Sequence, residues 1–382
     1  MELNYQDTTR TLGRLPLLAS SPLPPTKARP VGVSRLGGIL CFDPFELYQV
    51  GYITSPNMLV LGEIGRGKSA FVKTLLTREP EPHSSILILD PKGEYQSAAA
   101  LLGAQELALS QGAGLDPFAG VGRSRRLLGS AMVGLFRALY ERAPRPLEYR
   151  LMQDLVNQLL ASPESISLHY VAEVVKVDCP GTHAESLPLR RELHAQLMRL
   201  IEGDLAGVFG TEGSGSTLGN RVVVDLRSIG DRRLTGFAIS CLLRARIAQF
   251  ARGELGAGFV VVDEAWSVLQ HSDSVREMRE LFKLARSYGA SVIAVTHRLS
   301  DLDAESVELV KDVETRVIFR QPREELDQLS TILGLPSTAL ESLATLGRGE
   351  ALWCIGTHQF LVSHRLIGDE GALVDTDRAM RA

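Results

Sequence analysis

The chain has 382 residues, of which 45% are hydrophobic and 23% charged, and its formal net charge is −4. These values are ordinary for a folded protein and exclude an overall electrostatic attraction to nucleic acid or anionic lipid. The length exceeds that of a usual single core, so we expect one elaborated domain or two domains. The cysteines are far apart in the sequence, which predicts isolated thiols in a reducing compartment rather than a metal site. They are Cys41, Cys179, Cys241 and Cys354.

The first 30 residues are rich in proline and serine, which predicts a flexible tail. They lack the charged-then-apolar order of a signal peptide, and no apolar run in the chain approaches the ~18 residues of a membrane helix. We therefore expect a cytoplasmic chain that reaches the inner face of the membrane only through partner proteins. Two short apolar segments around Gly37 and Gly38 then predict a β-hairpin.

The segment LVLGEIGRGKSAF (59–71) carries the first recognisable chemistry. It matches the phosphate-binding pattern G-x-x-x-x-G-K-[ST], between an apolar run of buried-strand type and a segment with helical spacing. Glycines let backbone N–H groups and the helix N-terminus point at phosphates. We expect Lys68 to reach the β- and γ-phosphates of ATP and Ser69 to hold Mg²⁺. The predicted nucleotide-binding residues are Gly62, Glu63, Ile64, Gly65, Arg66, Gly67, Lys68, Ser69 and Ala70.

The segment SSILILDPKGEY (84–95) predicts a second buried strand that ends at Asp90. Asp90 or Glu94 could join the phosphate site, or Glu94 could cap a turn. From about 122 to 206 the spacing becomes helical, which predicts an all-α insertion. Leucines at 147, 151, 155 and 159 share one face there, and the basic cluster RSRR (123–126) is expected to be a solvated helix end.

The segment VVVDEAW (260–266) has the Walker B pattern, an apolar strand that delivers two acidic residues. We expect Asp263 to hold the Mg²⁺ shell, and Glu264 to orient and deprotonate the attacking water. The strand ASVIAVT ends with Thr296 and is followed by His297 at the carboxyl edge, where ligands bind in a parallel sheet. We expect His297 to sense the γ-phosphate; the alternative is a surface histidine.

Buried strands that alternate with helices predict an α/β fold, a P-loop NTPase of RecA-like type with a mainly parallel sheet. The segments EALWCIG and QFLVSHRL predict a C-terminal β-hairpin. The expected organisation is a tail (1–30), the first part of the ATPase core (31–121), the all-α insertion (122–206), the second part of the core (207–370) and a tail (371–382).

The segments GEIGRGKS, ILDPKGEY, VVVDEAW and LARSYGASVIAVTH together resemble the HerA/FtsK superfamily of hexameric P-loop motors. Within it they look most like the type IV secretion and conjugation ATPases of the TraC kind, the largest VirB-type ATPase, over about 31–365. This resemblance implies a Mg²⁺-dependent ATPase that forms a homohexamer and docks on membrane-embedded channel proteins. It also implies that Arg286, which ends the helix after Walker B, reaches the ATP of a neighbouring subunit. Arg316 and Arg348 are weaker candidates for that role.

Two features depart from this family. Its members usually carry glutamine where this chain has His297, which changes the hydrogen bonding of the sensor. Relatives often have a large N-terminal domain where this sequence has a short proline-rich segment, so docking would use another surface or another polypeptide. The favoured function is a hexameric ATPase that energises substrate transfer or channel assembly. The alternatives are a DNA translocase or coupling protein that itself pumps DNA, and a nucleotide-gated scaffold, which the intact Walker residues disfavour.

Overall fold

The computed structural model describes residues 28, 30–78, 85–109, 114–176, 186–203, 205–209, 218–265, 272–300, 302 and 304–374. The chain forms two compact units, which we describe separately: unit 1 comprises residues 1–82 and 291–382, and unit 2 comprises residues 83–290. The predicted α/β fold is confirmed, because parallel strands alternate with helices in both units.

Unit 1 contains strands in the order β2-β1-β11-β10-β9-β3-β8. β3 pairs in parallel with β8 and β9, whereas the pairs on the other side of β9 are antiparallel. Both predicted hairpins, β1–β2 and β10–β11, are confirmed. The strands are β1 (Pro30–Ser34), β2 (Ile39–Cys41), β3 (Met58–Leu61), β8 (Ala290–Thr296), β9 (Thr315–Phe319), β10 (Glu350–Ile355) and β11 (His358–His364).

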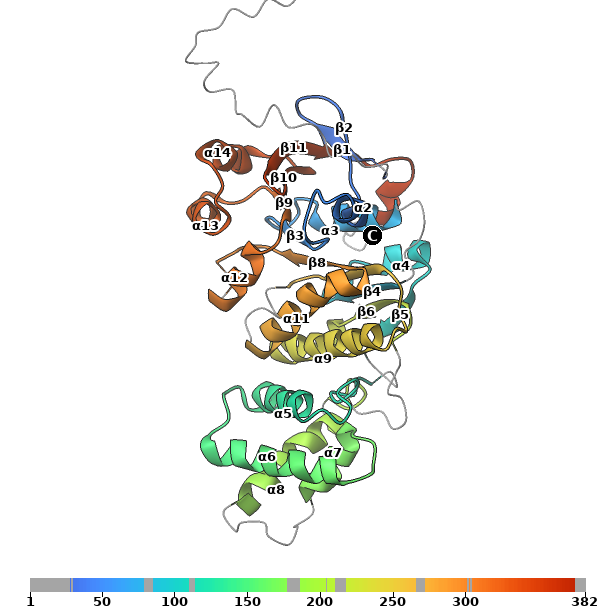
Figure 1. The fold of residues 1–382 in the computed structure, drawn as a ribbon, viewed down its shortest axis with the longest axis vertical. Helices are drawn as coiled ribbons and strands as arrows, with labels where there is room; N and C mark the ends of the chain where they lie inside the picture. Colours follow the sequence, from blue (N-terminus) through green and yellow to red (C-terminus); the bar gives the residue numbers. More distant parts are fainter. Residues whose placement is uncertain are drawn as a thin grey trace, which may run out of the picture. The chain divides into compact units, whose positions relative to one another are not determined.

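Helices cover both faces of the unit 1 strands, with α12, α13 and α14 on one side and α2 and α3 on the other (Figure 1). The core between them includes the fully buried Trp353, which packs edge-on against Phe42 and Phe71. A last short helix, α15, packs against α3. The bounds are α2 (Pro44–Gln49), α3 (Lys68–Thr77), α12 (Ala304–Lys311), α13 (Arg323–Leu333), α14 (Ser337–Thr345) and α15 (Glu370–Val374).

Unit 2 contains four parallel strands in the order β7-β4-β6-β5. The strands are β4 (Ser85–Asp90), β5 (Gln105–Ala108), β6 (Arg221–Asp225) and β7 (Gly258–Val262). Every residue of β4 and β7 is buried, which explains their unbroken apolar runs. β5 was not predicted, because its sequence QELA is polar and mostly exposed beside β6. The other elements outside the insertion are α4 (Gln96–Leu102), a 3₁₀ turn (Arg227–Ile229), α9 (Arg232–Ala251) and α11 (Ser272–Tyr288).

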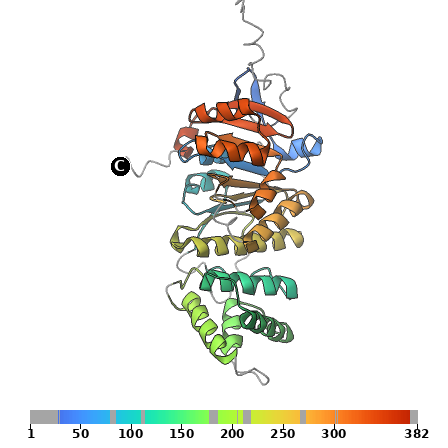
Figure 2. The same cartoon turned by 90° about the vertical axis from the view of Figure 1, so that its left-hand side faces the viewer.

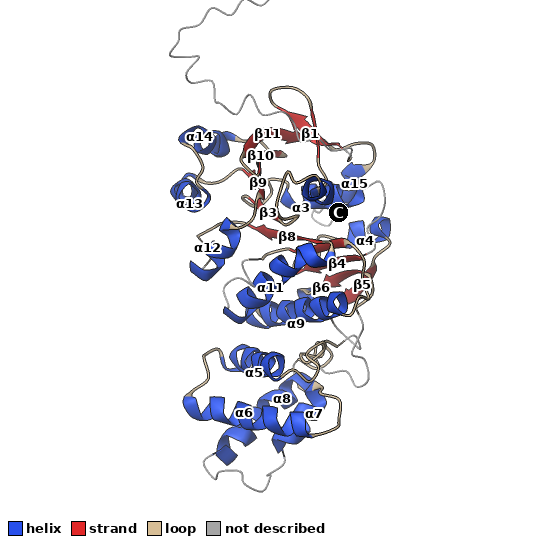
Figure 3. Cartoon of the chain, viewed as in Figure 1, coloured by secondary structure: helices blue, strands red, loops and turns tan. Residues whose placement is uncertain are grey.

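The predicted helical insertion consists of α5 (Arg125–Tyr140), α6 (Pro146–Ala161), α7 (Leu168–Lys176) and α8 (Leu187–Ile201). Figure 3 shows this part of unit 2 as helices joined by loops, and Figure 2 shows α5 beside α9, against which it packs. Leu151, Leu155 and Leu159 are buried, as their shared face predicts, whereas Leu147 in the first turn of α6 is 50% exposed. Throughout the ranges that the structure describes, every helix is too short or too polar to cross a bilayer.

Candidate functional site

The predicted phosphate loop lies between β3 and α3, in the strand–loop–helix context that its sequence pattern requires. Gly65 and Gly67 have φ of 75° and 109°, in the left-handed region that favours glycine. Gly67 is the N-cap of α3 and supplies no side-chain hydrogen bond to the first turn of the helix. The amide groups of that turn therefore suit an anion such as phosphate.

The phosphate loop is held in place by β9, which is a neighbour of β3 in the sheet, and by residues next to β9 and β10. A Cβ atom at Gly62 would lie 2.5 Å from the Cβ atom of Phe319, so only glycine fits against β9 there. The backbone N–H of Glu63 donates to the carbonyl oxygen of Arg320 at 3.0 Å. The N–H of Gly349, before β10, donates to the carbonyl of Arg66 at the same distance. These contacts fix the backbone of the loop independently of any bound group.

The side chain of Lys68 is buried at the first position of α3, and three hydrogen-bond acceptors among the described residues lie around its ammonium group. Its Nζ atom lies 2.6 Å from the carbonyl oxygen of Gly62, 3.0 Å from that of Glu63 and 2.8 Å from Nδ1 of His297. Since an ammonium group can only donate, Nδ1 of His297 accepts, which places the proton of the neutral ring on Nε2. This contact between Lys68 and His297 was not predicted from the sequence.

Strand register explains why His297 reaches the phosphate loop. Leu61, the last residue of β3, is aligned with Thr296, the last residue of β8. The residues that follow, Gly62 and His297, must therefore emerge side by side at the carboxyl edge of the strands. Thr296 is buried, and its hydroxyl oxygen has no hydrogen-bond partner among the described residues.

The remaining residues of the predicted nucleotide site lie on the same loop or at the start of α3. Ile64 at the tip is 76% exposed. Arg66 donates from Nε to the carboxylate of Glu63 at 3.0 Å. Ser69 and Ala70 are half-buried in the first turn of α3. The hydroxyl of Ser69 is thus in the part of α3 where a Walker A serine would meet Mg²⁺.

In unit 2, Asp90 organises the turn that follows β4. Its Oδ1 atom accepts backbone N–H bonds from Lys92 at 3.2 Å, Gly93 at 2.8 Å and Glu94 at 3.1 Å, and its Oδ2 atom accepts from Tyr95 at 2.8 Å. Burial raises the pKa of Asp90, although these four bonds oppose the rise. Asp90 therefore caps this turn; the sequence left open whether Glu94 would cap a turn or, like Asp90, join the phosphate site.

Asp263 and Glu264 follow β7 as the Walker B pattern predicts. Oδ1 of Asp263 accepts the N–H of Glu264 at 2.9 Å, and Oδ2 is buried without a hydrogen-bond partner among the described residues. Burial and the negative charges of Glu264, Glu94 and Asp90 raise the pKa of Asp263 to about 7. A divalent cation would favour the charged carboxylate and so oppose both effects, and Asp263 therefore fits the predicted role of a Mg²⁺ ligand.

Glu264 forms an ion pair with Lys92, from the turn that Asp90 organises. The Glu264 side chain is 8% exposed, and its φ of 52° is uncommon for a residue other than glycine. Burial lowers the pKa of Lys92, but the hydrogen bond and charge of Glu264, with the charges of Asp263 and Glu94, raise it overall. Sequence reasoning missed the role of Lys92. Lys92 lies just beyond β4, and Glu264 just beyond β7. This placement could have indicated their contact only if the pairing of β4 with β7 had been known.

The three arginines proposed as catalytic fingers occupy different surroundings. Arg286 is exposed in the last turn of α11. Arg316 is half-buried near the start of β9, at the end of the strand away from the phosphate loop, and donates to the carbonyl of Lys311 at 2.8 Å. Arg348 is exposed and precedes Gly349, which contacts the loop. The position of Arg316 makes it the weakest candidate of the three.

A glycine-rich loop on a parallel α/β sheet, with a lysine at the helix start and a strand that ends in Asp-Glu, defines the P-loop ATPase class of fold. Comparison with known proteins agrees with this assignment of the fold. Residues 52–198 match the family model described as "Helicase HerA, central domain", which confirms the resemblance to the HerA/FtsK superfamily. The comparison with curated proteins gives no match.

Solved proteins with a similar fold include VirB4 and TrwB. VirB4 of Thermoanaerobacter pseudethanolicus is similar over 92% of this chain and 100% of that chain, with a TM-score of 0.79 and 20% identity. The conjugative coupling protein TrwB, in a trigonal form with sulphate, is similar over 90% of this chain and 91% of that chain, with a TM-score of 0.58 and 14% identity. TrwB in complex with ADP and Mg²⁺ gives a TM-score of 0.56, also at 14% identity, over 90% of this chain and 91% of that chain.

Proposed function

We propose that this chain is a Mg²⁺-dependent ATPase that works as a homohexameric motor of a conjugation or type IV secretion system. The observation that carries the proposal is the phosphate loop, with Lys68 at the uncapped start of α3. The fold likeness to VirB4, which is closer than the likeness to TrwB, supports the assignment to secretion or conjugation. In this proposal the ring docks on channel proteins at the inner face of the membrane and energises substrate transfer or channel assembly.

Each residue has a defined task in the proposed reaction. Bound ATP and Mg²⁺ supply the transferable γ-phosphoryl group and the charge that screens it. Lys68 neutralises negative charge on the β- and γ-phosphates, and the N-terminal amides of α3 hold them in place. Ser69 and Asp263 are the proposed Mg²⁺ ligands, and Glu264 orients the attacking water and accepts its proton.

His297 is the proposed γ-phosphate sensor. The neutral ring described above keeps an N–H on Nε2, because Nδ1 accepts from Lys68. That N–H can donate to a phosphate oxygen, as the amide of a glutamine would. The substitution of histidine for the usual glutamine therefore preserves a donor, and it adds a direct connection between the sensor and Lys68.

Hydrolysis is tested by phosphate release from ATP with Mg²⁺, using the wild-type chain and the Lys68→Ala variant. The variant loses the cation nearest the transferred group, so we expect turnover to fall by more than about 100-fold, as for loss of one strong transition-state contact. Turnover of the variant close to that of the wild type would contradict the assignment of the phosphate loop.

The fold likeness to TrwB supports a second candidate function, that of a translocase or coupling protein that pumps DNA. Adding double-stranded DNA to the ATPase assay separates the two functions. A DNA pump is expected to be stimulated by DNA, and the stimulation should fade steeply with salt, because phosphate contacts release counterions. For the proposed secretion motor we expect ATP turnover that does not depend on DNA.

A further inference from the structure

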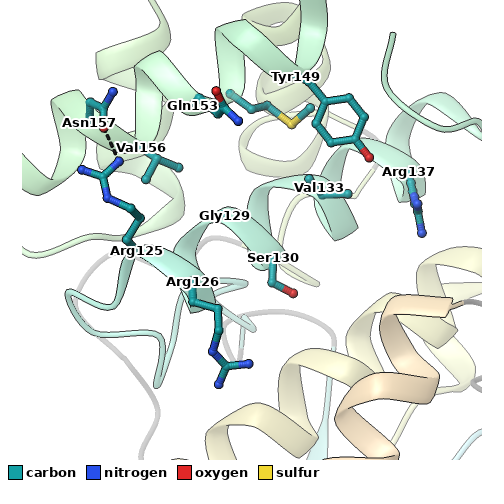
Figure 4. A pocket seen from close by; sticks show the side chains of 11 residues that line it. Arg125, Arg126, Gly129, Ser130, Val133, Arg137, Tyr149, Gln153, Val156 and Asn157 are labelled. Carbon is teal, nitrogen blue, oxygen red and sulfur yellow. Dashed lines mark hydrogen bonds between the residues drawn. The ribbon is translucent and has the colours of Figure 1, made fainter. Parts of the chain in front are cut away.

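A groove on the helical insertion of unit 2 takes no part in the proposed reaction. It lies between α5 and α6 and encloses a cavity of about 630 Å³ (Figure 4). Within the part of the chain that the structure describes, its lining residues come from these two helices, and none of them is acidic. They are Arg125, Arg126, Gly129, Ser130, Val133 and Arg137 from α5, and Tyr149, Met152, Gln153, Val156 and Asn157 from α6.

The charge of the groove comes from α5. This helix contains Arg125, Arg126 and Arg137 and no acidic residue. Arg125 donates a hydrogen bond to the amide oxygen of Asn157, which fixes the start of α5 beside the end of α6. Arg126 lies 3.7 Å from Glu280 of α11, but this pair is exposed and contributes little. The expectation that the cluster at 123–126 is only a solvated helix end is therefore incomplete.

The floor between the two positive ends is mainly apolar, although Ser130 and Gln153 also line the groove. It contains Val133, the buried Met152 and Val156, and the hollow left by Gly129. A Cβ atom at Gly129 would meet no other atom within 4 Å, so a larger side chain there would extend into the open space of the groove. Tyr149, which is 39% exposed, closes the end near Arg137. Arginine and tyrosine are the side chains that most often dominate binding energy at protein interfaces.

We propose that this groove binds an acidic amphipathic segment of a partner protein, with apolar side chains on the floor and carboxylates at both ends. Arg126 and Arg137 are eleven positions apart on α5, which is about 16 Å along a helix. An extended segment covers that span with about five residues, and a helical one with about eleven. Arginine also pairs with carboxylates through two parallel hydrogen bonds, which fixes the register of such a segment.

Charge spacing favours a peptide over nucleic acid. A track for single-stranded nucleic acid needs cations repeated along its length, because each nucleotide carries a phosphate. Here the arginines stand at the two ends, and the interval contains the apolar side chains of Val133, Met152 and Val156 and the uncharged polar side chains of Ser130 and Gln153. A segment with acidic ends and an apolar centre matches that order.

The test is selection of binding peptides from a random library of about 16 residues, a length that exceeds the helical span of the groove. We expect the enriched peptides to carry Asp or Glu on both sides of an apolar centre. Their affinity should fall at least about tenfold for the Arg125→Ala/Arg126→Ala double variant and for Gly129→Leu, which fills the hollow. Arg191→Ala, at an exposed arginine of α8 outside the groove, should bind like the wild type.

Thermal unfolding separates loss of binding from loss of fold. Glycine inside a helix is unfavourable, so Gly129→Leu should unfold at or above the temperature of the wild type. Enriched peptides without acidic residues, or with equal affinity for the wild type and both groove variants, would overturn the proposal. It would also be overturned if single-stranded DNA of matched length bound more tightly than the peptides and lost that binding in the same variants. These measurements use binding alone and do not depend on the proposed ATPase activity.

Discussion

The pair formed by Lys92 and Glu264 shows how single residues prepare the proposed chemistry. Glu264 is nearly buried and follows Asp263, another buried acid, so its carboxylate needs a counter-charge. Lys92 supplies it, and Asp90 holds Lys92 in place through the turn after β4. This arrangement makes Lys92 a residue that positions the proposed base.

Replacement of Lys92 tests that role. In Lys92→Ala the carboxylate of Glu264 loses the ion pair with Lys92, so we expect kcat for ATP hydrolysis to fall about tenfold or more, which is part of the roughly 10²–10⁴-fold that a general base contributes. KM should change little, because the phosphate loop is untouched. Lys92→Arg keeps the positive charge and should retain most of the activity.

The comparison between Lys92→Ala and Lys92→Arg identifies the cause. If both variants lose activity in proportion to a lower unfolding temperature, Lys92 is only structural. Unchanged kcat in Lys92→Ala would show that Glu264 needs no such partner.

At the scale of residues, the sequence predicted the local phosphate-loop motif well. It did not predict the contacts between residues that are far apart in the chain. The phosphate loop is a local pattern of eight residues, and the structure places it between β3 and α3 as expected. The contacts of Lys68 with His297 and of Lys92 with Glu264 depend on which strands are neighbours. Strand order follows from the whole fold, so no local pattern contains it.

Among the elements, α3 is held to the rest of unit 1 by Arg78, the C-cap of the helix. The buried guanidinium donates to the carboxylate of Glu370 at 2.7 and 2.5 Å, and to the carbonyl oxygens of Pro30 at 2.9 Å and Arg365 at 2.6 Å. It thereby joins the end of α3 to β1, to the segment after β11 and to α15. The helix that begins with Lys68 is thus fixed at its far end too.

Replacement of Arg78 should lower the stability of the folded chain. Arg78→Ala leaves Glu370 and two carbonyl groups without their buried donor, so we expect a loss of about 3–5 kcal/mol in the free energy of unfolding. Arg78→Lys should recover only part of this, because an ammonium group lacks the fork of the guanidinium. Urea unfolding provides the measurement.

A matched control is Arg252→Ala, which removes an exposed arginine paired with Glu254. Exposed ion pairs contribute about 0–1 kcal/mol to the free energy of unfolding, so the stability of this variant should be close to that of the wild type. An equal, small effect of Arg78→Ala and Arg252→Ala would contradict the structural role of Arg78.

Elements with a continuous apolar pattern were predictable, and polar ones were not. β4, β7 and β8 are buried along their whole length and were expected as core strands. β5 and α15 escaped prediction, since β5 is polar and α15 has only five residues. Such elements form because the surrounding fold supplies a place for them, and their own sequence carries little signal.

At the scale of the whole molecule, the proposal requires neighbouring subunits. Arg286 is exposed in the last turn of α11, and we propose that it acts on the ATP of another subunit. An arginine supplied in this way contributes about 10³–10⁵ in rate. We therefore expect Arg286→Ala to fold and bind ATP, with turnover reduced by a factor in that range.

Mixing variants tests this contribution from a neighbouring subunit. When Arg286→Ala is mixed with Lys68→Ala under conditions of subunit exchange, some interfaces pair an intact loop with an intact arginine, so part of the turnover should return. Absence of any rescue, or full activity of Arg286→Ala in a sample shown to be monomeric, would exclude the proposed finger.

The proposed ATP hydrolysis depends most directly on Glu264 as its base. The decisive measurement is ATP turnover by Glu264→Gln, with nucleotide affinity determined on the same sample and Glu94→Gln as the control. We expect Glu264→Gln to bind ATP like the wild type and to hydrolyse it about 10²–10⁴-fold more slowly, because the amide keeps the shape of the side chain and loses the base. Unchanged turnover in Glu264→Gln, with an inactive Glu94→Gln, would contradict the account and move the catalytic base to Glu94.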